Sequence, residues 1–266
     1  MIDFKLLSKK VRANALKMVH KAKASHIASA LSIVDILTVL YGSVMKFDKS
    51  NTDLLERDRL ILSKGHACVA VYSVLAEVGI IEKEELKTYG EDFSWLMNHI
   101  SHKVDGVEFS AGALGHGLSF GVGKALSAKI QKLSFRTFVI LSDGEMDEGS
   151  TWEALMFAAH HKLDNLTAII DYNKIQSLDS IENTLNLEPL AEKISSFGCE
   201  VYEVDGHNFE ELIQSLNKRP RNKPKVIIAH TIKGKGVSFM EDTVEWHYKN
   251  PSDHDLEIAL KELENA

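Results

Sequence analysis

Short apolar runs and longer amphipathic segments alternate along the chain. Five runs of four to six residues, rich in β-branched and other apolar side chains, predict buried strands at 59–62, 137–141, 166–171, 200–204 and 226–230. Between them, apolar residues recur with a helical period at 32–44, 67–78, 118–131, 151–161, 188–197 and 209–216. This alternation predicts an α/β fold, with right-handed crossovers and a mostly parallel sheet covered by helices on both faces.

Both ends of the chain also favour helices. Residues 1–25 alternate Lys with apolar side chains at helical spacing and lack the apolar core and cleavage site of a signal peptide. Residues 252–264 read as a capped terminal helix. No repeat or flexible linker interrupts the sequence, so we expect a single domain over residues 1–266.

Composition excludes several classes of function. The net charge of −7 argues against nucleic-acid binding, and we interpret the short basic cluster at 218–225, which contains two prolines, as a solvated loop. No apolar stretch is expected to approach the roughly 20 residues that cross a bilayer, so no membrane contact is expected. Cys68 and Cys199 lie far apart, as in proteins of reducing compartments. We therefore expect a cytoplasmic protein.

The strongest chemical signal is the acidic turn that follows the second predicted strand. Asp143 offers a hard oxygen ligand to a divalent cation, and Gly144 lets backbone N–H groups approach an anion. Asn173 follows the third strand, 30 residues after Asp143, so both side chains should emerge at the carboxyl edge of the sheet. Each residue alone is explained more simply as a helix cap or a turn residue. Together they favour a magnesium site completed by a backbone carbonyl and diphosphate oxygens.

These segments resemble the transketolases, which are thiamine-diphosphate-dependent enzymes. The Asp-Gly pair followed about 30 residues later by Asn is similar to the thiamine-diphosphate signature. Further stretches match transketolases in order across nearly the whole chain: 63–67 (Ser-Lys-Gly-His-Ala), 106–117, and 230–237 followed by Trp246 and His247. In that family the first domain binds the diphosphate and the metal, whereas a second domain binds the aminopyrimidine and carries the activating glutamate.

The resemblance therefore implies the N-terminal, diphosphate-binding subunit of a split transketolase. Such an enzyme transfers a two-carbon ketol unit from a ketose donor to an aldose acceptor, either of which can be a sugar phosphate. Its implied cofactors are thiamine diphosphate and Mg²⁺, with Ca²⁺ as a second option. The implied partner is a C-terminal subunit that carries the pyrimidine-binding domain, in an α₂β₂ heterotetramer that is active only when complete.

The resemblance also implies individual roles. The metal ligands would be Asp143, Asn173 and the carbonyl of Ile175. Besides that metal pair, the residues in contact with the cofactor would be His66, Gly115, His116, Gly117, Gly144 and His247. The catalytic histidines would be His26, His66, His99 and His247, because imidazole exchanges protons near neutral pH and a ring of histidines would favour negative charge on substrate oxygens.

Two carboxylates are candidates for the interface with the other half of the cofactor site. Glu148 and Glu153 match family glutamates in a proton-sharing network there, although acids near a helix start also simply complement the helix dipole.

The sequence departs from the family pattern at two places. Ser25 and the pair Ile27-Ala28 surround His26 where the family usually has Gly-His-Pro-Gly, and His116 stands where transketolases often have Gln. We interpret the other histidines as surface or packing residues: His20, His102, His160, His161, His207, His230 and His254.

Three alternatives remain open from the sequence. The alpha subunit of a 2-oxo-acid dehydrogenase also carries the metal motif on a separate chain, but that family lacks the Ser-Lys-Gly-His and Lys-Gly-Lys-Gly stretches. Another thiamine-diphosphate-dependent carboligase could act on a specialised sugar. A non-catalytic scaffold would have no reason to keep Asp143, Asn173 and His66 together.

Overall fold

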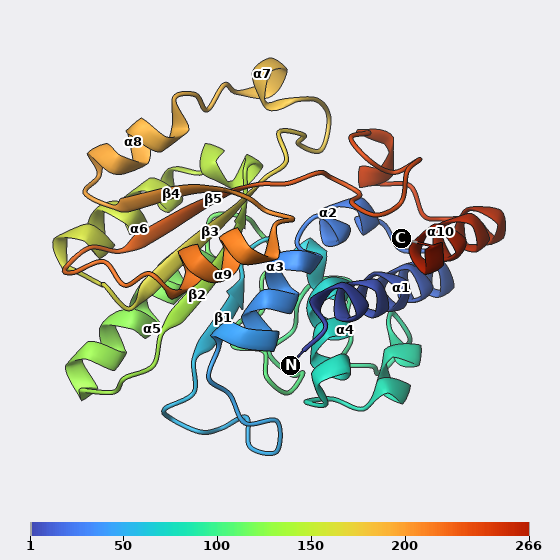
Figure 1. The fold of residues 1–266 in the computed structure, drawn as a ribbon, viewed down its shortest axis with the longest axis horizontal. Helices are drawn as coiled ribbons and strands as arrows, with labels where there is room; N and C mark the ends of the chain where they lie inside the picture. Colours follow the sequence, from blue (N-terminus) through green and yellow to red (C-terminus); the bar gives the residue numbers. More distant parts are fainter. Residues whose placement is uncertain (1, 266) are drawn as a thin grey trace.

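Five parallel strands form a single sheet in the computed structural model, which describes residues 2–265. Their order across the sheet is β1-β2-β3-β5-β4 (Figure 1). The strands are β1 (Arg59–Leu62), β2 (Thr137–Ser142), β3 (Leu166–Tyr172), β4 (Glu200–Asp205) and β5 (Lys225–His230). All four neighbouring pairs are parallel, so the five carboxyl ends share one edge. The predicted α/β fold is confirmed.

Helices cover both faces of this sheet. One face is covered by α2 (Ile27–Leu31), α3 (Val34–Val39), α4 (Cys68–Val78) and α9 (Phe209–Asn217). Farther from the strands, α1 (Phe4–Ala22) packs on α3 and α4, and α10 (Asp253–Asn265) packs on α1. The other face of the sheet is packed by α5 (Gly117–Gln131), α6 (Gly149–His160), α7 (Ile181–Thr184) and α8 (Leu190–Ser196). The helix predicted at 188–197 is α8, which begins at Leu190 and ends at Ser196.

Side-chain alternation along the strands builds two cores. Phe138 and Ile140 of β2 belong to the hydrophobic cluster on one face, whereas Val139 and Leu141 belong to the cluster on the other. All four side chains are at most 1% exposed. Burial on both faces explains why the strands read as continuous apolar runs and not as alternating ones.

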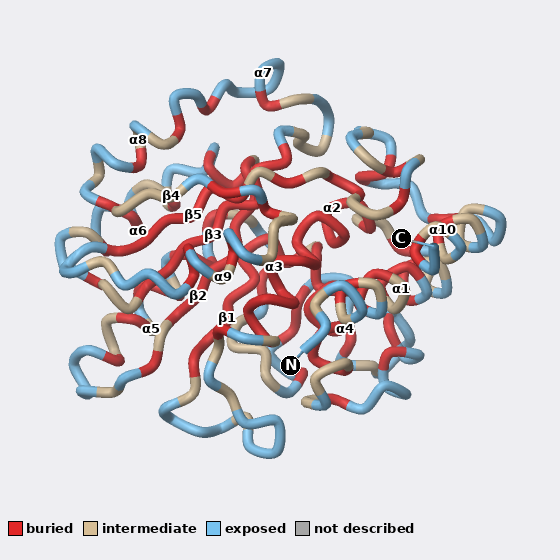
Figure 2. The backbone as a smooth tube through the Cα atoms, viewed as in Figure 1, coloured by how far each residue is buried: buried red, intermediate tan, exposed pale blue. Residues whose placement is uncertain are grey.

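The most apolar segment of the chain corrects two expectations. Residues 32–44 were predicted as one helix, but within them α3 gives way to a π-helical turn at Leu40–Val44, and the separate short helix α2 precedes them. By length and composition the 18 residues Ile27–Val44 could cross a membrane, contrary to the expectation that no stretch approached that length. However, 89% of this window is buried inside the protein (Figure 2), which is the setting of a core helix.

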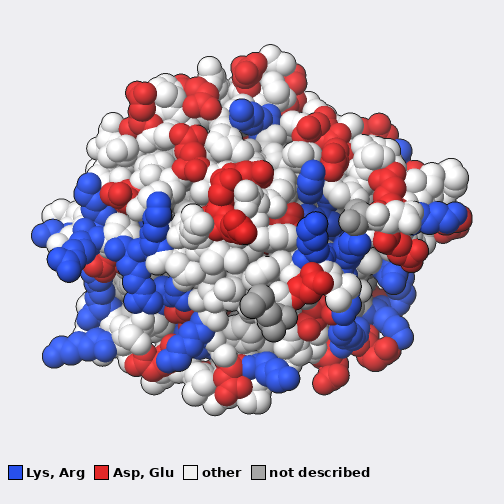
Figure 3. Space-filling model, viewed as in Figure 1, with Lys and Arg blue, Asp and Glu red and all other residues white. Residues whose placement is uncertain are grey.

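Charged side chains of both signs lie on the face of the molecule drawn in Figure 3, where Lys and Arg are interspersed with Asp and Glu. The two cysteines are free and buried.

Candidate active site

A cavity of about 250 Å³ opens at the carboxyl edge of the sheet. Its lining comes from the segments that follow β1, β2, β3 and β5 and from the loop before α2. Its polar lining residues are His26, Ser29, Lys64, His66, His99, Ser142, Asp143, Asn173, Gln176, Ser177, Lys233, His247 and Tyr248. Residues from both ends of the sequence therefore meet where a parallel sheet places its ligand sites.

The four histidines selected from the sequence form one group. The ring centroid of His26 lies 5.1 Å from that of His66, 5.0 Å from that of His247 and 6.1 Å from that of His99. His66 and His247 are 5.9 Å apart. His26 stands at the centre of the group, although its position was the one that the unusual neighbours put in question.

The loop around His26 is held by its backbone. His26 has a φ of +69° in the left-handed region and begins α2. Its backbone N–H donates to the carbonyl oxygen of His247 at 2.9 Å. Its Nδ1 is buried and has no hydrogen-bond partner within the protein. His26 lines the cavity, and a buried polar atom without a partner is an exception that a bound ligand or water would explain.

The buried imidazoles are neutral near pH 7. Burial, aided by His99, lowers the pKa of His26 to about 4. Burial and the nearby Lys233 lower the pKa of His247 to about 3, and burial with Lys64 holds the pKa of His66 well below its usual value. These three rings therefore supply proton donors and acceptors, and not the positive charge that we expected from a ring of histidines.

The positive charge comes from two buried lysines that the sequence reasoning did not select. Lys64 and Lys233 are each 1% exposed. Lys64 Nζ lies 2.5 Å from Asp171 Oδ2. Burial and repulsion from Lys64 lower the pKa of Lys233 to about 8, so its amine is still mainly protonated at pH 7. The sequence could have indicated both lysines, because each lies inside a glycine-containing stretch, 63–67 or 230–237, that resembles the transketolases.

Lys233 connects the metal-ligand candidates to the histidines. Its Nζ donates to the carbonyl oxygens of Ile175 and Gln176 at 2.8 and 3.0 Å, and lies 2.9 Å from Nδ1 of His247. An ammonium group has three protons, so it can satisfy these three acceptors. His247 is then neutral with its proton on Nε2.

Asp143 is a buried carboxylate without an ion pair in the part of the chain described. It is 2% exposed and accepts backbone N–H groups from Gly144 at 2.8 Å and Lys174 at 2.7 Å. Burial and the neighbouring Asp171 raise the pKa of Asp143 to about 7. Such a group gains from a bound cation. It also begins a short 3₁₀ helix at Gly144–Asp147, as the simpler explanation of this residue proposed.

Two further oxygens lie near Asp143 in the same cavity. Asn173 is 7% exposed, and its Oδ1 accepts from the Ile175 N–H at 3.2 Å. Ile175 keeps one carbonyl lone pair beyond the bond from Lys233. A carboxylate, an amide oxygen and a backbone carbonyl are the hard donors that Mg²⁺ or Ca²⁺ prefers, so these residues fit a divalent cation.

The glycines of the 115–117 segment are engaged within the protein. Gly115 N donates to Glu145 Oε1 at 2.7 Å, and Gly117 N donates to Ser63 Oγ at 2.9 Å. His116 is exposed, with its Nδ1 2.8 Å from the carbonyl oxygen of Leu114. None of these three predicted contacts is among the residues that line the cavity, although Gly144 is. Their role at the diphosphate stays a prediction.

The two candidate interface glutamates are exposed outside the cavity. Glu148 lies beside Gly115, where an added Cβ would meet the Glu148 Cβ at 2.8 Å. Glu153 lines a separate groove of about 330 Å³ between α5 and α6, together with Val122, Leu126 and Phe157. Their part in an interface stays a prediction.

Comparisons with known proteins identify the family. Residues 4–263 match the family model described as transketolase, thiamine diphosphate binding domain. One subunit of the apulose-4-phosphate transketolase of Phocaeicola vulgatus is 41% identical over 97% of this chain and 92% of its own length. The 6-deoxy-6-sulfo-D-fructose transketolase subunit SqwG of a Clostridium species is 39% identical over 99% of this chain and 97% of its own.

A solved structure supports the same conclusion. The transketolase of Campylobacter jejuni superposes with a TM-score of 0.93 at 30% identity, covering 99% of this chain. This chain spans only 43% of that protein. Fold, cavity and relatives together define a thiamine-diphosphate-binding subunit of the transketolase type. The chain belongs to the transketolase family, which confirms the resemblance and favours the transketolase over the 2-oxo-acid dehydrogenase.

Proposed function

We propose that this chain supplies the diphosphate- and metal-binding half of a two-chain transketolase, and that a partner chain with a pyrimidine-binding domain completes each site. The observation that carries the proposal is the cavity in which four histidines and two lysines face Asp143 and Asn173. The length of the chain agrees with it, because the relatives of similar length are named as subunits.

The cavity residues divide into two groups by their chemistry. Asp143, Asn173 and the carbonyl of Ile175 would hold Mg²⁺, while Lys64 and Lys233 would balance the negative charge of the diphosphate. Thiamine diphosphate, when bound, supplies the carbon nucleophile and the electron sink for transfer of a two-carbon unit. The protein has to place a sugar beside it and to move protons at the sugar hydroxyls.

Neutral imidazoles suit this proton transfer. His26 lines the cavity, and at neutral pH its neutral ring can accept a hydroxyl proton and return it. His247 accepts from Lys233 at Nδ1 and therefore carries its proton on Nε2, from which it can donate to a substrate oxygen. His66 and His99 complete the group, with His99 exposed at the rim of the cavity in this chain.

The substrates belong to the ketose and aldose classes. One relative is named for a sugar phosphate and another for a sulfonated sugar. We therefore propose a ketose donor with an anionic terminal group, whose distal end is gripped mainly by the partner chain. An α₂β₂ assembly would place each cavity between this chain and its partner.

Reconstitution tests the proposal. This chain is purified alone and together with the product of the adjacent gene, and both samples are assayed with ketose and aldose pairs, thiamine diphosphate and Mg²⁺. Ketol transfer is expected only in the mixture. Two results would overturn the proposal: turnover by the single chain at the rate of a complete transketolase, or a mixture that binds the cofactor and decarboxylates 2-oxo acids without transferring a ketol unit.

A further inference from the structure

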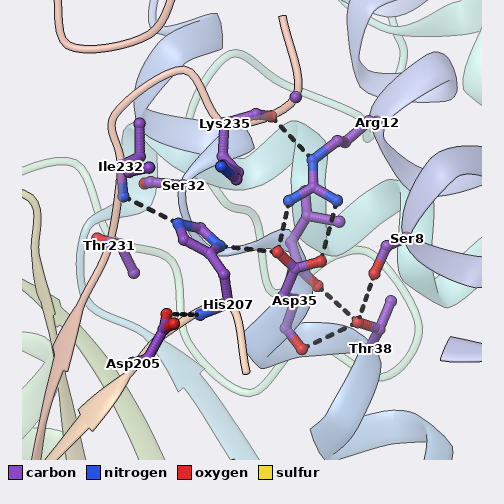
Figure 4. Close-up of polar contacts among 12 residues, drawn as sticks. Ser8, Arg12, Ser32, Asp35, Thr38, Asp205, His207, Thr231, Ile232 and Lys235 are labelled. Atoms are coloured by element: carbon purple, nitrogen blue, oxygen red, sulfur yellow. Dashed lines mark hydrogen bonds and ion pairs between the residues drawn. The ribbon is translucent and has the colours of Figure 1, made fainter. Parts of the chain in front are cut away.

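A buried ion pair lies behind the wall of the cavity, between α1 and α3. Arg12 donates to both carboxylate oxygens of Asp35, at 2.9 and 2.7 Å (Figure 4). Arg12 is 6% exposed and Asp35 5%. Burial alone would raise the pKa of Asp35, but Arg12 and a hydrogen bond from His207 outweigh it and hold the pKa well below its usual range. Asp35 is therefore ionised and holds two donors.

The second donor is His207, which the sequence alone leaves as a surface or packing residue. Its Nδ1 lies 2.8 Å from Asp35 Oδ2, and its Nε2 accepts the backbone N–H of Ile232 at 2.9 Å. A backbone N–H can only donate, so Nε2 carries no proton and Nδ1 carries the proton that Asp35 accepts. Asp35 thus orients His207 as an acceptor for the chain that leaves β5.

Arg12 holds the same loop at a second point. Its Nε donates to the carbonyl oxygen of Lys235 at 2.9 Å (Figure 4). Gly236 follows with a φ of +95°, and a Cβ there would meet Arg12 Cδ at 3.0 Å, so the loop backbone lies directly against the guanidinium. The loop is therefore held at residues 232 and 235, by two side chains that share Asp35.

Lys233 lies between these two points, and its side chain extends into the cavity. Its Nζ contacts three acceptors within 3.0 Å, including Nδ1 of His247. The position of that Nζ depends on where the backbone of residue 233 is held. A misplacement of about 1 Å in an active site can cost about a hundredfold in rate.

We propose that Asp35 is a positioning residue which, through His207 and Arg12, holds the 232–235 loop so that Lys233 meets His247. This proposal rests on the proposed function only for its kinetic consequence. A purely structural alternative exists, because Arg12 and Asp35 also join two helices, and removing one member of a buried ion pair destabilises a protein wherever the pair lies. The test must therefore read out the cavity and not only stability.

Substitutions of His207 separate the two explanations without breaking the Arg12–Asp35 pair. His207→Phe keeps the ring volume and removes the acceptor for Ile232 N–H, whereas His207→Gln keeps an acceptor near the position of Nε2. His230→Phe is the matched control, because His230 also pairs with a carboxylate, Glu203, at 2.9 Å but on the exposed surface.

Two readouts are measured on the full chain and on its complex with the partner. The first is the tautomer of His247 in long-range ¹H–¹⁵N spectra of histidine-labelled protein, which requires no activity. The second is the division of any kinetic loss between kcat and the KM for the sugar.

We expect His207→Phe to disturb the His247 signals and to lower kcat about tenfold or more with a smaller change in KM. His207→Gln should restore most of both, and His230→Phe should change neither. Unchanged His247 signals in His207→Phe, or equal losses in the Phe and Gln variants, would overturn the proposal. If the wild-type complex shows no ketol transfer, the proposed function fails, yet the spectra still decide whether His207, which Asp35 orients, positions this loop.

Discussion

Nζ of Lys233 lies 2.9 Å from Nδ1 of His247, and both side chains are buried. The contact sets the tautomer of the imidazole and, after burial, is the largest cause that lowers its pKa to about 3. One lysine thus fixes the tautomer of His247 and adds to the effect of burial in keeping the ring neutral.

Replacing Lys233 should therefore change the titration of His247. In Lys233→Met the pKa of His247 is expected to rise from about 3, but not to its usual value, because burial remains. An NMR titration of the His247 ring measures this shift. Lys235→Met is the matched control, because its Nζ lies 3.5 Å from Glu241 and makes no contact with His247. A titration midpoint that does not move in Lys233→Met would contradict the assigned contact.

The neutral histidines should make the protein sensitive to acid. The pKa of His26 is about 4 in the folded chain, against 6.5 for an ordinary histidine. The unfolded chain thus takes up the proton first, so stability present above about pH 6.5 is lost as the pH falls towards 4. Because His26 is partly exposed, solvent screening should make this loss of unfolding free energy smaller than the pKa difference alone implies.

Denaturant melts between pH 4 and pH 8 measure this loss. His26→Asn should flatten the dependence on pH, whereas His254→Asn, on the surface of α10, should leave it as in the wild type. Parallel curves for wild type and His26→Asn would show that the ring does not lie in the environment described.

Substitutions of Asp143 and Asn173 should weaken cofactor and metal binding much more than they lower the stability of the chain. Asp143→Ala should abolish retention of thiamine diphosphate and Mg²⁺ by the complex, because it removes the charged ligand. It should cost little stability, since loss of a helix cap costs about 1 kcal/mol and the buried carboxylate is itself unfavourable. Asn173→Ala should act in the same direction more mildly, because water can replace a neutral amide.

Cofactor titrations and thermal melts on the same samples test this difference. Asp147→Ala is a suitable control, because Asp147 is an exposed carboxylate of the same turn that accepts from Gln176 Nε2 at 2.9 Å. If both metal-pair variants melted earlier yet bound cofactor and Mg²⁺ as tightly as the wild type, Asp143 and Asn173 would be structural residues only.

The pair of Lys64 and Asp171 should matter for folding as well as for the charge in the cavity. Both residues are at most 1% exposed, and Asp171 also accepts from Ser32 Oγ at 2.7 Å. Lys64→Met leaves a buried carboxylate without its cation, which should cost about 3–5 kcal/mol of unfolding free energy. Combining it with Asp171→Asn should cost less than the sum of the single losses. Additive losses in urea melts would show that the two side chains do not interact.

The groove between α5 and α6 should belong to an interface. Phe157 is 44% exposed beside Glu153 and lies along a groove with Val122 and Leu126. Phe157→Lys should weaken assembly of the complex without lowering the melting temperature of the chain alone. Light scattering measures the assembly, and Leu178→Lys, at another exposed apolar position elsewhere, provides the comparison. Assembly that both variants leave intact would remove this face from the interface.

The sequence predicted the sheet well because four of its five strands are buried on both faces, while the edge strand β4 is partly exposed. Runs such as 137–141 and 166–171 are continuously apolar, and that pattern cannot belong to a solvated strand. The short helix α2 and the π-helical turn after α3 were not predicted, because an apolar segment buried on all sides shows no period that marks where a helix starts or changes.

The site was predicted in part for a similar reason. Asp143 and Asn173 could be paired because strand ends in a parallel sheet meet at one edge. Lys64, Lys233 and His207 were missed because charged or polar side chains are assigned to the surface by default. Only the folded structure shows their polar partners, which are Asp171 for Lys64, His247 for Lys233 and Asp35 for His207.

The hydrogen bond from the N–H of His26 to the carbonyl oxygen of His247 has a consequence for how the protein is made. A ribosome releases His26 early and His247 late, so a nascent polypeptide holds three of the four imidazoles without the stretch of backbone that orders the central one. The cavity that we propose for the cofactor is therefore complete only after synthesis has passed Tyr248. A chain cut short before His247 would lack both that imidazole and the carbonyl oxygen that accepts the N–H of His26.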